Sequence, residues 1–483
     1  MAAKTVIVVG SGLAGLSAAH KALKKGANVH MFERAPKPGG NSMKASSGIN
    51  GAGTKFQKEY GVESDESFFG DTVSSAGLRL SQAAEQQEKD RRDLIDILTT
   101  RSKDAVSWLT DEIGVDLSVV AQLGGHSVPR THRGKGNPPP GAAIVGALLK
   151  KLGENSGFTI STSANVDALL TSSNGDGSVR VTGIRYTVDG ECRELSGPVV
   201  FAAGGFAGDA QGLMAKYRPD LAGFPSTNDA RPGSHGLLAD IGAEFVDMDS
   251  VQIHPTGFVD PKESSATWYI LAAEALRGEG GILLSADGHR FVNEMEKRDV
   301  VSDAIMRLPC ADLESEKVGT KQWQVTLLLD PGACEASASH LGFYLWKGLM
   351  QKKKVKDLPP PVIDAVDKYA RAVAAGSDEV FGRKTFGHWK LVAGEENRET
   401  EVCVGTVTPV THFTMGGVLF NTKTQVLGRR GDSVAPIDGI WVAGEITGGI
   451  HGDNRLGGSS LLECAVFGIM AGDEAAENLI MGE

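Results

Sequence analysis

The sequence contains few cysteines, and they lie far apart. Five cysteines occur in 483 residues, without the CxxC, CxxCH or closely spaced Cys/His patterns that hold zinc, c-type haem or iron–sulfur clusters. We therefore expect no metal site and no internal chain of redox centres. Widely spaced cysteines also favour a reducing compartment. The five are Cys192, Cys310, Cys334, Cys403 and Cys464.

Long apolar runs and an excess of positive charge are also missing. No stretch approaches the ~18 apolar residues of a transmembrane helix. Lys and Arg number 49 against 60 Asp and Glu, a net charge of −11, which disfavours nucleic acid as a partner. The first four residues lead directly into an apolar strand pattern, which leaves no room for a targeting peptide. We expect a soluble cytoplasmic protein without membrane insertion, or an organelle-matrix protein if a leader has been trimmed.

Glycine, by contrast, is abundant. The chain has 62 glycines, where average usage of ~7% predicts about 34. It has no collagen period, and its 41% hydrophobic and 23% charged residues are typical of an ordinary globular protein. Glycine permits positive φ and close approach to the backbone. The surplus therefore predicts tight turns around a large ligand, in a chain long enough for two or three domains.

A strand, a glycine turn, a helix and a second strand open the chain. The apolar run 5–9 is followed by Gly10, Gly12 and Gly15, then by a helical pattern and an apolar strand that ends at Glu33. Such glycines let a pyrophosphate approach the backbone at a helix N-terminus, and the carboxylate can accept hydrogen bonds from ribose hydroxyls. The alternative is an ordinary glycine-rich turn with a surface glutamate. The unit predicts dinucleotide binding without distinguishing FAD from NAD.

The rest of the chain indicates one α/β domain with an insertion. Short alternating stretches from 158 to 200 predict an antiparallel meander, which leads into a buried strand that ends in two glycines. A further apolar strand at 439–445 is followed by a helical pattern. Between them, 249–404 has a mixed pattern, and we expect a linker at the proline-rich stretch 358–362.

Several glycine-rich segments resemble those of one flavoprotein family. They are Gly39-Gly40-Asn41-Ser42, Ser46-Ser47-Gly48-Ile49, Gly444-Glu445 and Gly457-Gly458-Ser459-Ser460-Leu461. The chain resembles the fumarate reductase and succinate dehydrogenase family over nearly its whole length. This resemblance implies FAD bound by Gly10, Gly12, Ala14, Gly15, Glu33, Gly39, Gly40, Asn41, Ser42, Ser47, Gly48, Gly204, Gly205, Glu445, Gly458, Ser460 and Leu461.

The resemblance also implies an architecture. We expect an α/β fold with a Rossmann-like FAD-binding domain of the glutathione-reductase type, made of residues 1–248 and 405–483. An α+β capping domain, residues 249–404, is inserted into it. In the membrane-bound relatives a histidine links covalently to FAD. The GGNS segment contains no histidine, so we expect FAD to be bound non-covalently.

Five further motifs look like those of the soluble fumarate reductases. They are Gln252–Thr256, Glu274–Gly278, Arg290–Asp299, His412–Gly417 and His451–Gly458. Matched motif by motif, they imply carboxylate ligands and an acid with its proton path. The carboxylate ligands are His254, His412 and Arg455, the general acid is Arg298, and the path that returns its proton is Glu274 and Arg277.

The chemistry explains why these residue types are needed. Fumarate carries two carboxylates on a planar alkene, and the resemblance implies that reduced flavin N5 delivers a hydride to one alkene carbon. An arginine can bind a carboxylate through two parallel hydrogen bonds and stabilise the negative charge that develops. A guanidinium with a pKa above ~12 is always protonated at neutral pH. An arginine acid therefore needs neighbours that return its proton.

Each of these residues also has a structural alternative. A lone histidine before proline, or in a turn, is more often structural than a ligand, and exposed ion pairs contribute little. A Glu and an Arg three positions apart on a helix can form a plain salt bridge. The alternatives are a surface pair of Arg298 with Asp299, structural roles for His254 and His412, and a salt bridge between Glu274 and Arg277.

The sequence departs from the family's pattern in two places. Ala273 stands where many fumarate reductases have threonine, so one hydroxyl contact to a carboxylate is absent or supplied elsewhere. The stretch Arg231–Gly236 lacks an acidic residue that is common there, which leaves the flavin contacts of this stretch open.

No second dinucleotide fingerprint follows the first. We therefore expect the electron donor to be a reduced flavin or a partner domain or protein rather than NADH, and the substrate to be a small dicarboxylate, fumarate or succinate. One alternative is a related flavin enzyme that acts on urocanate, L-aspartate or a 3-ketosteroid; a steroid would not need two histidines and an arginine for carboxylates. The other is a flavin electron-transfer module of a larger polypeptide.

Overall fold

A nine-stranded sheet forms the larger part of the computed structural model, which describes residues 5–136, 138–263, 266–313, 320–431 and 433–481. The spatial order is β6-β2-β1-β10-β22-β8-β7, with β21 paired to β22 and β9 to β8. Neighbours from β6 to β22 are parallel, as in a Rossmann-like fold. The strands are β1 (Thr5–Val9), β2 (Asn28–Phe32), β6 (Phe158–Ser161), β7 (Asn165–Ser173), β8 (Val179–Val188), β9 (Glu191–Ser196), β10 (Val199–Phe201), β21 (Gln425–Arg430) and β22 (Ser433–Val442).

Helices cover this sheet, so its central strands carry apolar residues on both faces. Helix α1 (Leu13–Lys24) packs along the C-terminal helix α14 (Ser459–Met481), and α6 (Pro140–Gly153) packs against α1. Gly468 and Gly472 of α14 face α1 so closely that a Cβ at either position would overlap its backbone. The helical pattern after the last apolar strand is therefore confirmed, and its glycines serve packing.

The predicted meander is confirmed in its main part. Strands β7, β8 and β9 pair antiparallel in sequence order. The first expected segment differs, because β6 lies at the opposite edge of the sheet, parallel to β2. A strand of four residues carries too little pattern to indicate which edge it joins.

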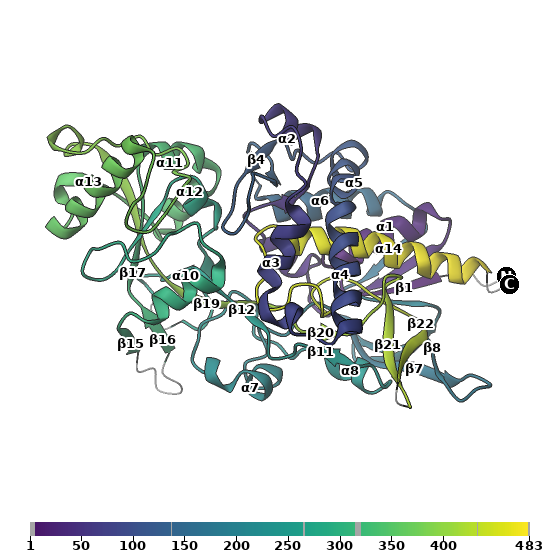
Figure 1. Ribbon diagram of the computed structural model, residues 1–483. Coiled ribbons are helices and arrows are strands. Elements are labelled where there is room, and N and C mark those ends of the chain that lie inside the picture. The colour runs from purple at the N-terminus through teal and green to yellow at the C-terminus, as the bar shows by residue number, and fades with distance from the viewer. Residues whose placement is uncertain (1–4, 137, 264–265, 314–319, 432, 482–483) are drawn as a thin grey trace.

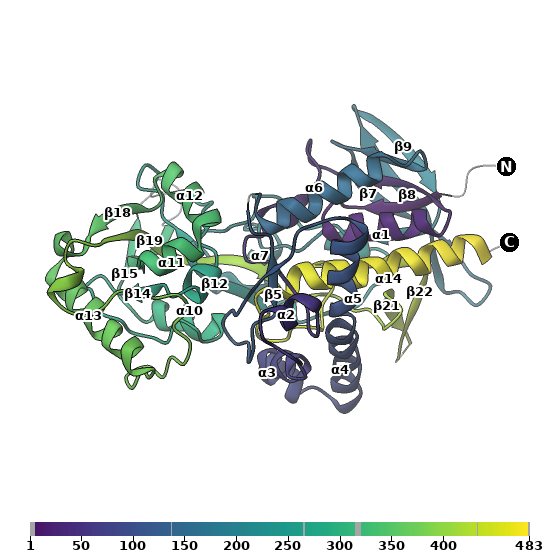
Figure 2. The same ribbon diagram turned by 90° about the horizontal axis from the view of Figure 1, so that it is seen from above.

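A second, six-stranded sheet forms the other lobe, on the left in Figure 1 and Figure 2. Its order is β13-β12-β19-β17-β14, and β18 pairs with β19. The strands are β12 (Val251–Phe258), β13 (Ile270–Leu271), β14 (Ile282–Leu284), β17 (Val325–Leu329), β18 (Gln351–Lys354) and β19 (Glu401–Thr414). Around them lie β15 (Cys310–Leu313), β16 (Thr320–Trp323), α9 (Ala275–Gly278), α10 (Arg298–Met306), α11 (Pro331–Ala336), α12 (Ala338–Lys347) and α13 (Pro360–Ala375). This mixed lobe confirms the expected α+β architecture.

The proline-rich stretch 358–362 is not a linker. Pro360 is the first residue of α13, and Pro359 precedes it as the N-cap. Proline suits the first helical turn, where its missing N–H would have no intrahelical partner and its fixed φ is already helical. The prediction of a linker was wrong because proline marks helix starts as well as connections.

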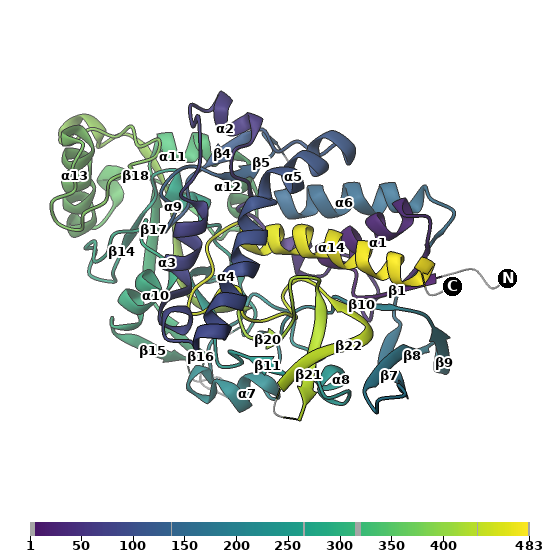
Figure 3. The same cartoon turned by 45° about the vertical axis from the view of Figure 1, so that its right-hand side comes forward.

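Shorter elements complete the larger lobe. Helices α3 and α4 pack side by side (Figure 3), and β3, β5 and β4 form a small sheet. Their bounds are α2 (Lys55–Glu59), α3 (Phe68–Ser81), α4 (Glu85–Thr100), α5 (Ser102–Ser107), α7 (Leu213–Tyr217), α8 (His235–Ala239), β3 (Ile49–Asn50), β4 (Val119–Ala121), β5 (Thr131–Arg133), β11 (Phe245–Val246) and β20 (Gly417–Val418). Within the described ranges, no helix is both long and apolar enough to cross a bilayer.

Candidate active site

A cavity of about 940 Å³ lies where the two sheets meet. Every residue predicted to bind the cofactor lines it except Gly15 and Gly39. Of the predicted substrate and acid residues, Arg298, His412 and Arg455 line it too. The cavity therefore connects the glycine-rich turns of the larger lobe with the polar cluster at the second sheet.

The glycine turn after β1 shapes one end of the cavity. Gly10 has φ +102°, and a Cβ there would overlap the carbonyl oxygen of Ala202. A Cβ at Gly15 would overlap the carbonyl oxygen of Gly10, so this glycine permits the helix to pack on the strand without reaching the cavity. Gly12 caps α1, and the unpaired N–H groups of a helix start attract an anion such as a phosphate.

The carboxylate of Glu33 holds this turn in place. Its oxygens accept hydrogen bonds from the Ser11 N–H at 3.1 Å, the Ser11 hydroxyl at 2.6 Å and the Ala35 N–H at 2.8 Å. The same Ser11 hydroxyl accepts the N–H of Gly39 at 3.0 Å. This hydrogen bond holds Gly39 behind the residues that line the cavity. Glu33 itself lines the cavity, so it shapes the turn and also offers an acceptor to a ligand.

Glu445 faces the cavity at the end of β22. It is buried and accepts the Thr414 N–H at 3.0 Å. Burial raises the pKa of Glu445 to about 7, although the Thr414 hydrogen bond opposes the shift. Gly205 stands so close to Glu445 and Thr414 that a Cβ would overlap both side chains. The strand-end glycine is therefore required by this polar contact.

Arg298 and Arg455 converge on one side chain, Gln252. Arg298 begins α10, and its Nη1 donates to Gln252 Oε1 at 2.8 Å. Arg455 Nη2 donates to the same oxygen at 2.9 Å, and its guanidinium lies 4.2 Å from the centre of the Phe413 ring. The Nε of Arg455 is buried with no hydrogen-bond partner among the described residues. Two cationic groups thus share one neutral acceptor, and the Nε of Arg455 remains available to a ligand.

Two histidines stand beside these arginines. The rings of His254 and His412 lie 5.3 Å apart. His412 Nδ1 bonds with the Thr227 hydroxyl at 2.9 Å, and His254 Nδ1 bonds with the backbone of Thr256 at 3.2 Å. His254 Nε2 is buried with no hydrogen-bond partner in the described part of the chain. Each ring is therefore fixed by a hydrogen bond to one nitrogen, and its second nitrogen is available to a ligand.

Glu274 lies behind Arg298 as seen from the cavity. The Arg298 Nε donates to Glu274 Oε2 at 2.7 Å, and Arg298 is only 5% exposed. The surface pair with Asp299 is therefore not what the structure shows. Arg277 Nη2 lies 3.9 Å from Glu274 Oε1, and Arg277 Nη1 donates to the Glu294 carbonyl at 2.6 Å. The three predicted acid-path residues are consecutive neighbours, with the looser step between Glu274 and Arg277.

The cluster carries excess positive charge in a buried place. Burial raises the pKa of Glu274, but Arg298 and Arg277 outweigh it and hold this pKa at about 2. Burial, with Arg298 next, lowers the pKa of Arg455 to about 9 and the pKa of His412 well below its usual range. At pH 7 the histidines are neutral donors and the arginines are cations. Such a site favours an anion with more than one negative charge.

Sequence reasoning assigned no role to Gln252, although it belongs to the motif Gln252–Thr256. Its Nε2 donates to Asn454 Oδ1 at 3.1 Å and to the Arg455 carbonyl at 2.7 Å, while its oxygen accepts both arginines. A Gln two positions before a His on a strand points to the same face of the sheet. That spacing was the available signal.

Comparisons with known proteins agree with this geometry. A family model described as "FAD binding domain" matches residues 5–461. The chain is 38% identical to "Fumarate reductase" of Schizosaccharomyces pombe, over 98% of this chain and 90% of that protein. It is also 38% identical to "Fumarate reductase 1" of Saccharomyces cerevisiae, over 99% of this chain and 100% of that protein. The solved open conformation of a flavocytochrome c3 fumarate reductase superposes with a TM-score of 0.71 at 32% identity, and the match covers 99% of this chain and 79% of that one.

Proposed function

Because the chain belongs to the fumarate reductase and succinate dehydrogenase family of FAD-binding flavoproteins, we propose that it reduces fumarate to succinate. The observation that carries this proposal is the buried set of arginines and neutral histidines where the glycine-lined cavity meets the second sheet. A planar dianion needs donors for two carboxylates and an acid for one carbon. This cluster offers both within one buried volume.

The residues of the larger lobe fit FAD. The N-terminus of α1 and the turn at Gly10 and Gly12 suit the pyrophosphate, Glu33 suits ribose hydroxyls, and the glycines at the strand ends leave room for a ring system. When bound, FAD supplies the hydride. We expect the cofactor residues named from the sequence to make these contacts.

The polar cluster binds, polarises and protonates. His254, His412 and Arg455 hold the two carboxylates, and Arg455 stabilises the charge that develops next to one of them. Arg298 gives its proton to the carbon that carries this charge. Glu274, in contact with Arg298, returns a proton to it, and Arg277 supplies Glu274 in turn.

We propose that the substrate lies between two domains, residues 1–248 with 405–483 and residues 249–404. The cavity has walls from both sides of this division, including Trp268 and Arg298 from the cap side and Glu445 from the other. Strand β19 runs through position 405 and carries His412 near its end. The boundary in the sequence thus falls inside one strand that links the cap to the substrate site.

For the electron donor we propose a reduced flavin or a partner domain or protein. Three exposed aromatic side chains, Trp268, Phe343 and Trp346, line the same cavity, together with Lys44 and Lys347. Aromatic faces can stack on a planar ring and lysines can bind its phosphate. We also propose a reducing compartment, the cytoplasm or an organelle matrix, because Cys192, Cys334, Cys403 and Cys464 form no disulfide in the described part of the chain.

A steady-state assay of the purified, FAD-loaded chain tests the proposal. We expect fumarate to oxidise reduced methyl viologen and reduced FMN, with succinate as the product, and NADH alone to give no such reaction. Urocanate, L-aspartate and a 3-ketosteroid, tested with matched dyes, represent the related enzymes. Preference for one of them, or no turnover with any, would overturn the assignment in favour of that enzyme or of an electron-transfer module.

The cofactor should come off without breaking a covalent bond. The GGNS segment places Asn41 and Ser42 at the cavity and offers no histidine for a flavin linkage. We expect acid precipitation of the holoprotein to leave all flavin in the supernatant, with the mass of FAD. A yellow pellet that retains flavin after denaturation would show a covalent link instead.

The pH dependence of kcat/KM should reflect the titration of Arg455 and not that of the histidines. The pKa of Arg455 in the free protein is about 9 because burial disfavours its charge, and kcat/KM reports the free enzyme. Below pH 9 the guanidinium is protonated and binds a carboxylate; above it the cation is lost. We expect a plateau from about pH 6 to 8 and a fall above about 9. An inflection near pH 6.5 that disappears in His254→Asn would contradict neutral histidines.

A further inference from the structure

The loop between β4 and β5, residues 122–130, reaches across to Glu274. The N–H of Gly124 donates to Glu274 Oε1 at 3.0 Å, while Arg298 binds the other oxygen of the same carboxylate. The next residue, Gly125, donates its N–H to the Met295 carbonyl at 3.3 Å. The larger lobe therefore contacts the cap through two consecutive glycines, and the first of them binds Glu274 of the proposed proton path.

No side chain fits where the loop makes this contact. A Cβ on Gly124 would lie 2.5 Å from the Glu296 carbonyl oxygen and 3.0 Å from Glu274 Oε1. A Cβ on Gly125 would lie 3.0 Å from both Leu456 and Lys297. The loop is wedged between Glu274 and the segment that leads into α10.

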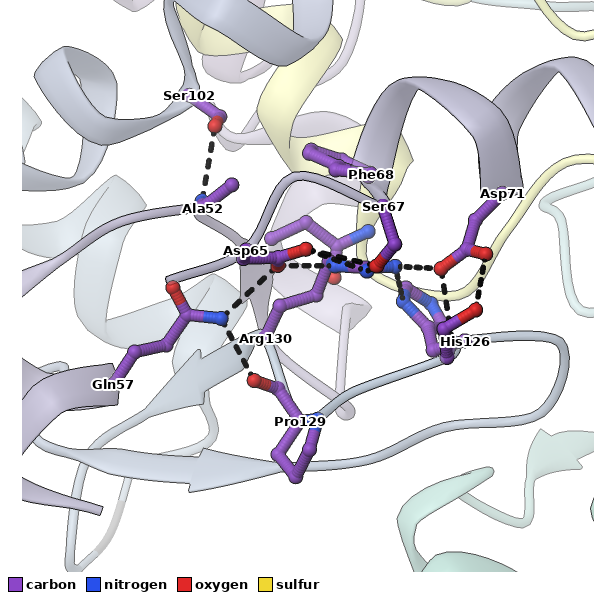
Figure 4. Close-up of polar contacts among 12 residues, drawn as sticks. Ala52, Gln57, Asp65, Ser67, Phe68, Asp71, Ser102, His126, Pro129 and Arg130 are labelled. Atoms are coloured by element: carbon purple, nitrogen blue, oxygen red, sulfur yellow. Dashed lines mark hydrogen bonds and ion pairs between the residues drawn. The ribbon is translucent and has the colours of Figure 1, made fainter. Parts of the chain in front are cut away.

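A buried arginine anchors the far end of the loop (Figure 4). Arg130 is fully buried and binds both oxygens of Asp65, through Nε at 2.7 Å and Nη2 at 2.9 Å. Its Nη1 donates to Asp71 at 2.6 Å, and its guanidinium lies 4.8 Å from the centre of the Phe68 ring. These contacts come from the start of α3 and the segment before it. They fix Arg130 in one orientation.

His126 connects Arg130 to Gly457, which lies next to Glu274 and Arg298. Arg130 Nη1 donates to His126 Nδ1 at 2.9 Å, so the ring proton is on Nε2, which donates to the Gly457 carbonyl at 3.1 Å. Burial, with Arg130 next, lowers the pKa of His126 to about 4, which keeps the ring neutral. Gly457 is so close to the acid pair that a Cβ would lie 2.7 Å from Glu274 Oε2 and 3.1 Å from Arg298 Nη2.

We propose that His126, held by Arg130, is a positioning residue that keeps Gly124 and Gly457 against Glu274 and so aims one carboxylate oxygen at Arg298. The proposal rests on the proposed function. Glu274 has two cationic neighbours, Arg298 at 2.7 Å and Arg277 at 3.9 Å. Because the Gly124 N–H binds Oε1, the carboxylate of Glu274 cannot rotate to bring that oxygen within hydrogen-bond distance of Arg277. Return of a proton to Arg298 therefore depends on a loop that touches neither substrate nor cofactor.

Substitution of His126 tests this positioning by separating kcat from KM. In His126→Ala we expect kcat for fumarate to fall about tenfold, as the loss of one buried hydrogen bond of about 1.4 kcal/mol predicts. KM should change less than about threefold, since the carboxylate ligands keep their contacts. The solvent deuterium isotope effect on kcat should rise because proton return becomes slower. His126→Gln, whose amide offers one donor and one acceptor as the neutral ring does, should recover most of kcat.

His132→Gln is the matched control. This second buried histidine lies two residues after Arg130, and its ring bonds with the Thr54 hydroxyl at 2.7 Å and with the Arg130 carbonyl at 2.8 Å. It therefore contacts the backbone of the loop's anchor but bonds with neither Gly457 nor Glu274. It should lose stability without a change in isotope effect. Gly124→Ala provides a second test, because its Cβ displaces the loop directly and should reproduce the His126→Ala pattern. Normal kcat in both His126→Ala and Gly124→Ala, with an active wild type, would overturn the proposal. An inactive wild type would instead overturn the proposed function.

Discussion

Replacing Arg298 with alanine should reduce kcat for fumarate by about 10² to 10⁴, the range that a general acid contributes. Arg298 is buried, donates to Gln252 and Glu274 and lines the cavity. No other cationic side chain among the described residues is bonded to both of these partners. Without it the alkene loses its proton donor and part of the positive field that polarises it. Stopped-flow oxidation of the reduced holoprotein by fumarate would measure this loss directly.

The same variant should keep its FAD spectrum, since the hydrogen bonds of Arg298 go to Gln252 and Glu274 and not to residues predicted to hold the cofactor. Arg298→Lys retains the charge next to Glu274 and guards against a folding failure; we expect it to be intermediate in rate. Arg307→Ala is the control, because Arg307 caps the other end of α10 and is exposed. If Arg298→Ala turned over at near-normal rate with intact flavin, Arg298 would not be the acid.

The cofactor half of the site could be predicted because its determinants are local. Gly10, Gly12 and Glu33 form one strand–turn–helix–strand unit, and each residue's task follows from backbone geometry that neighbours along the chain define. Even there the structure adds a contact: the Glu33 carboxylate binds the Ser11 N–H. A pattern can indicate a ribose acceptor, but it cannot show that the acceptor also holds its own turn.

The acid half could be predicted only through the family's motifs. Gln252 and Arg455, which share a hydrogen bond, are 203 residues apart in the chain, and Gly124 and Glu274 are 150 apart. Contacts of this kind depend on how β12 meets the segment of Arg455 and how the 122–130 loop meets Glu274 in space, and no periodicity encodes them. The same limit explains why β6 was assigned to the meander when it lies at the opposite edge of the sheet.

Replacing Arg455 with leucine should raise KM for fumarate and lower kcat/KM by about 30- to 4000-fold, the equivalent of the roughly 2–5 kcal/mol lost when one partner of a buried charge pair is removed. The neutral histidines can donate hydrogen bonds but cannot replace the charge. Because Arg455 lies over Phe413 and beside Gln252, leucine fills part of the same apolar space. Initial rates over a fumarate series, with flavin content checked, give both constants.

The ligand-free Arg455→Leu protein should also be more stable than the wild type, and this gain separates a binding role from a structural one. Burial lowers the pKa of Arg455 to about 9, below that of a free guanidinium, so the folded protein disfavours this charge at every pH below about 9 and removal of the charge relieves it. We expect Tm at pH 7 to rise without ligand, and fumarate to raise it further only in the wild type. Arg429→Leu, at an exposed arginine paired with Glu244, should change neither KM nor the response to fumarate. A lower Tm for Arg455→Leu would mean that Arg455 stabilises the fold. The positive charge of the cluster would then have a structural role and would not by itself indicate a binding site for an anion.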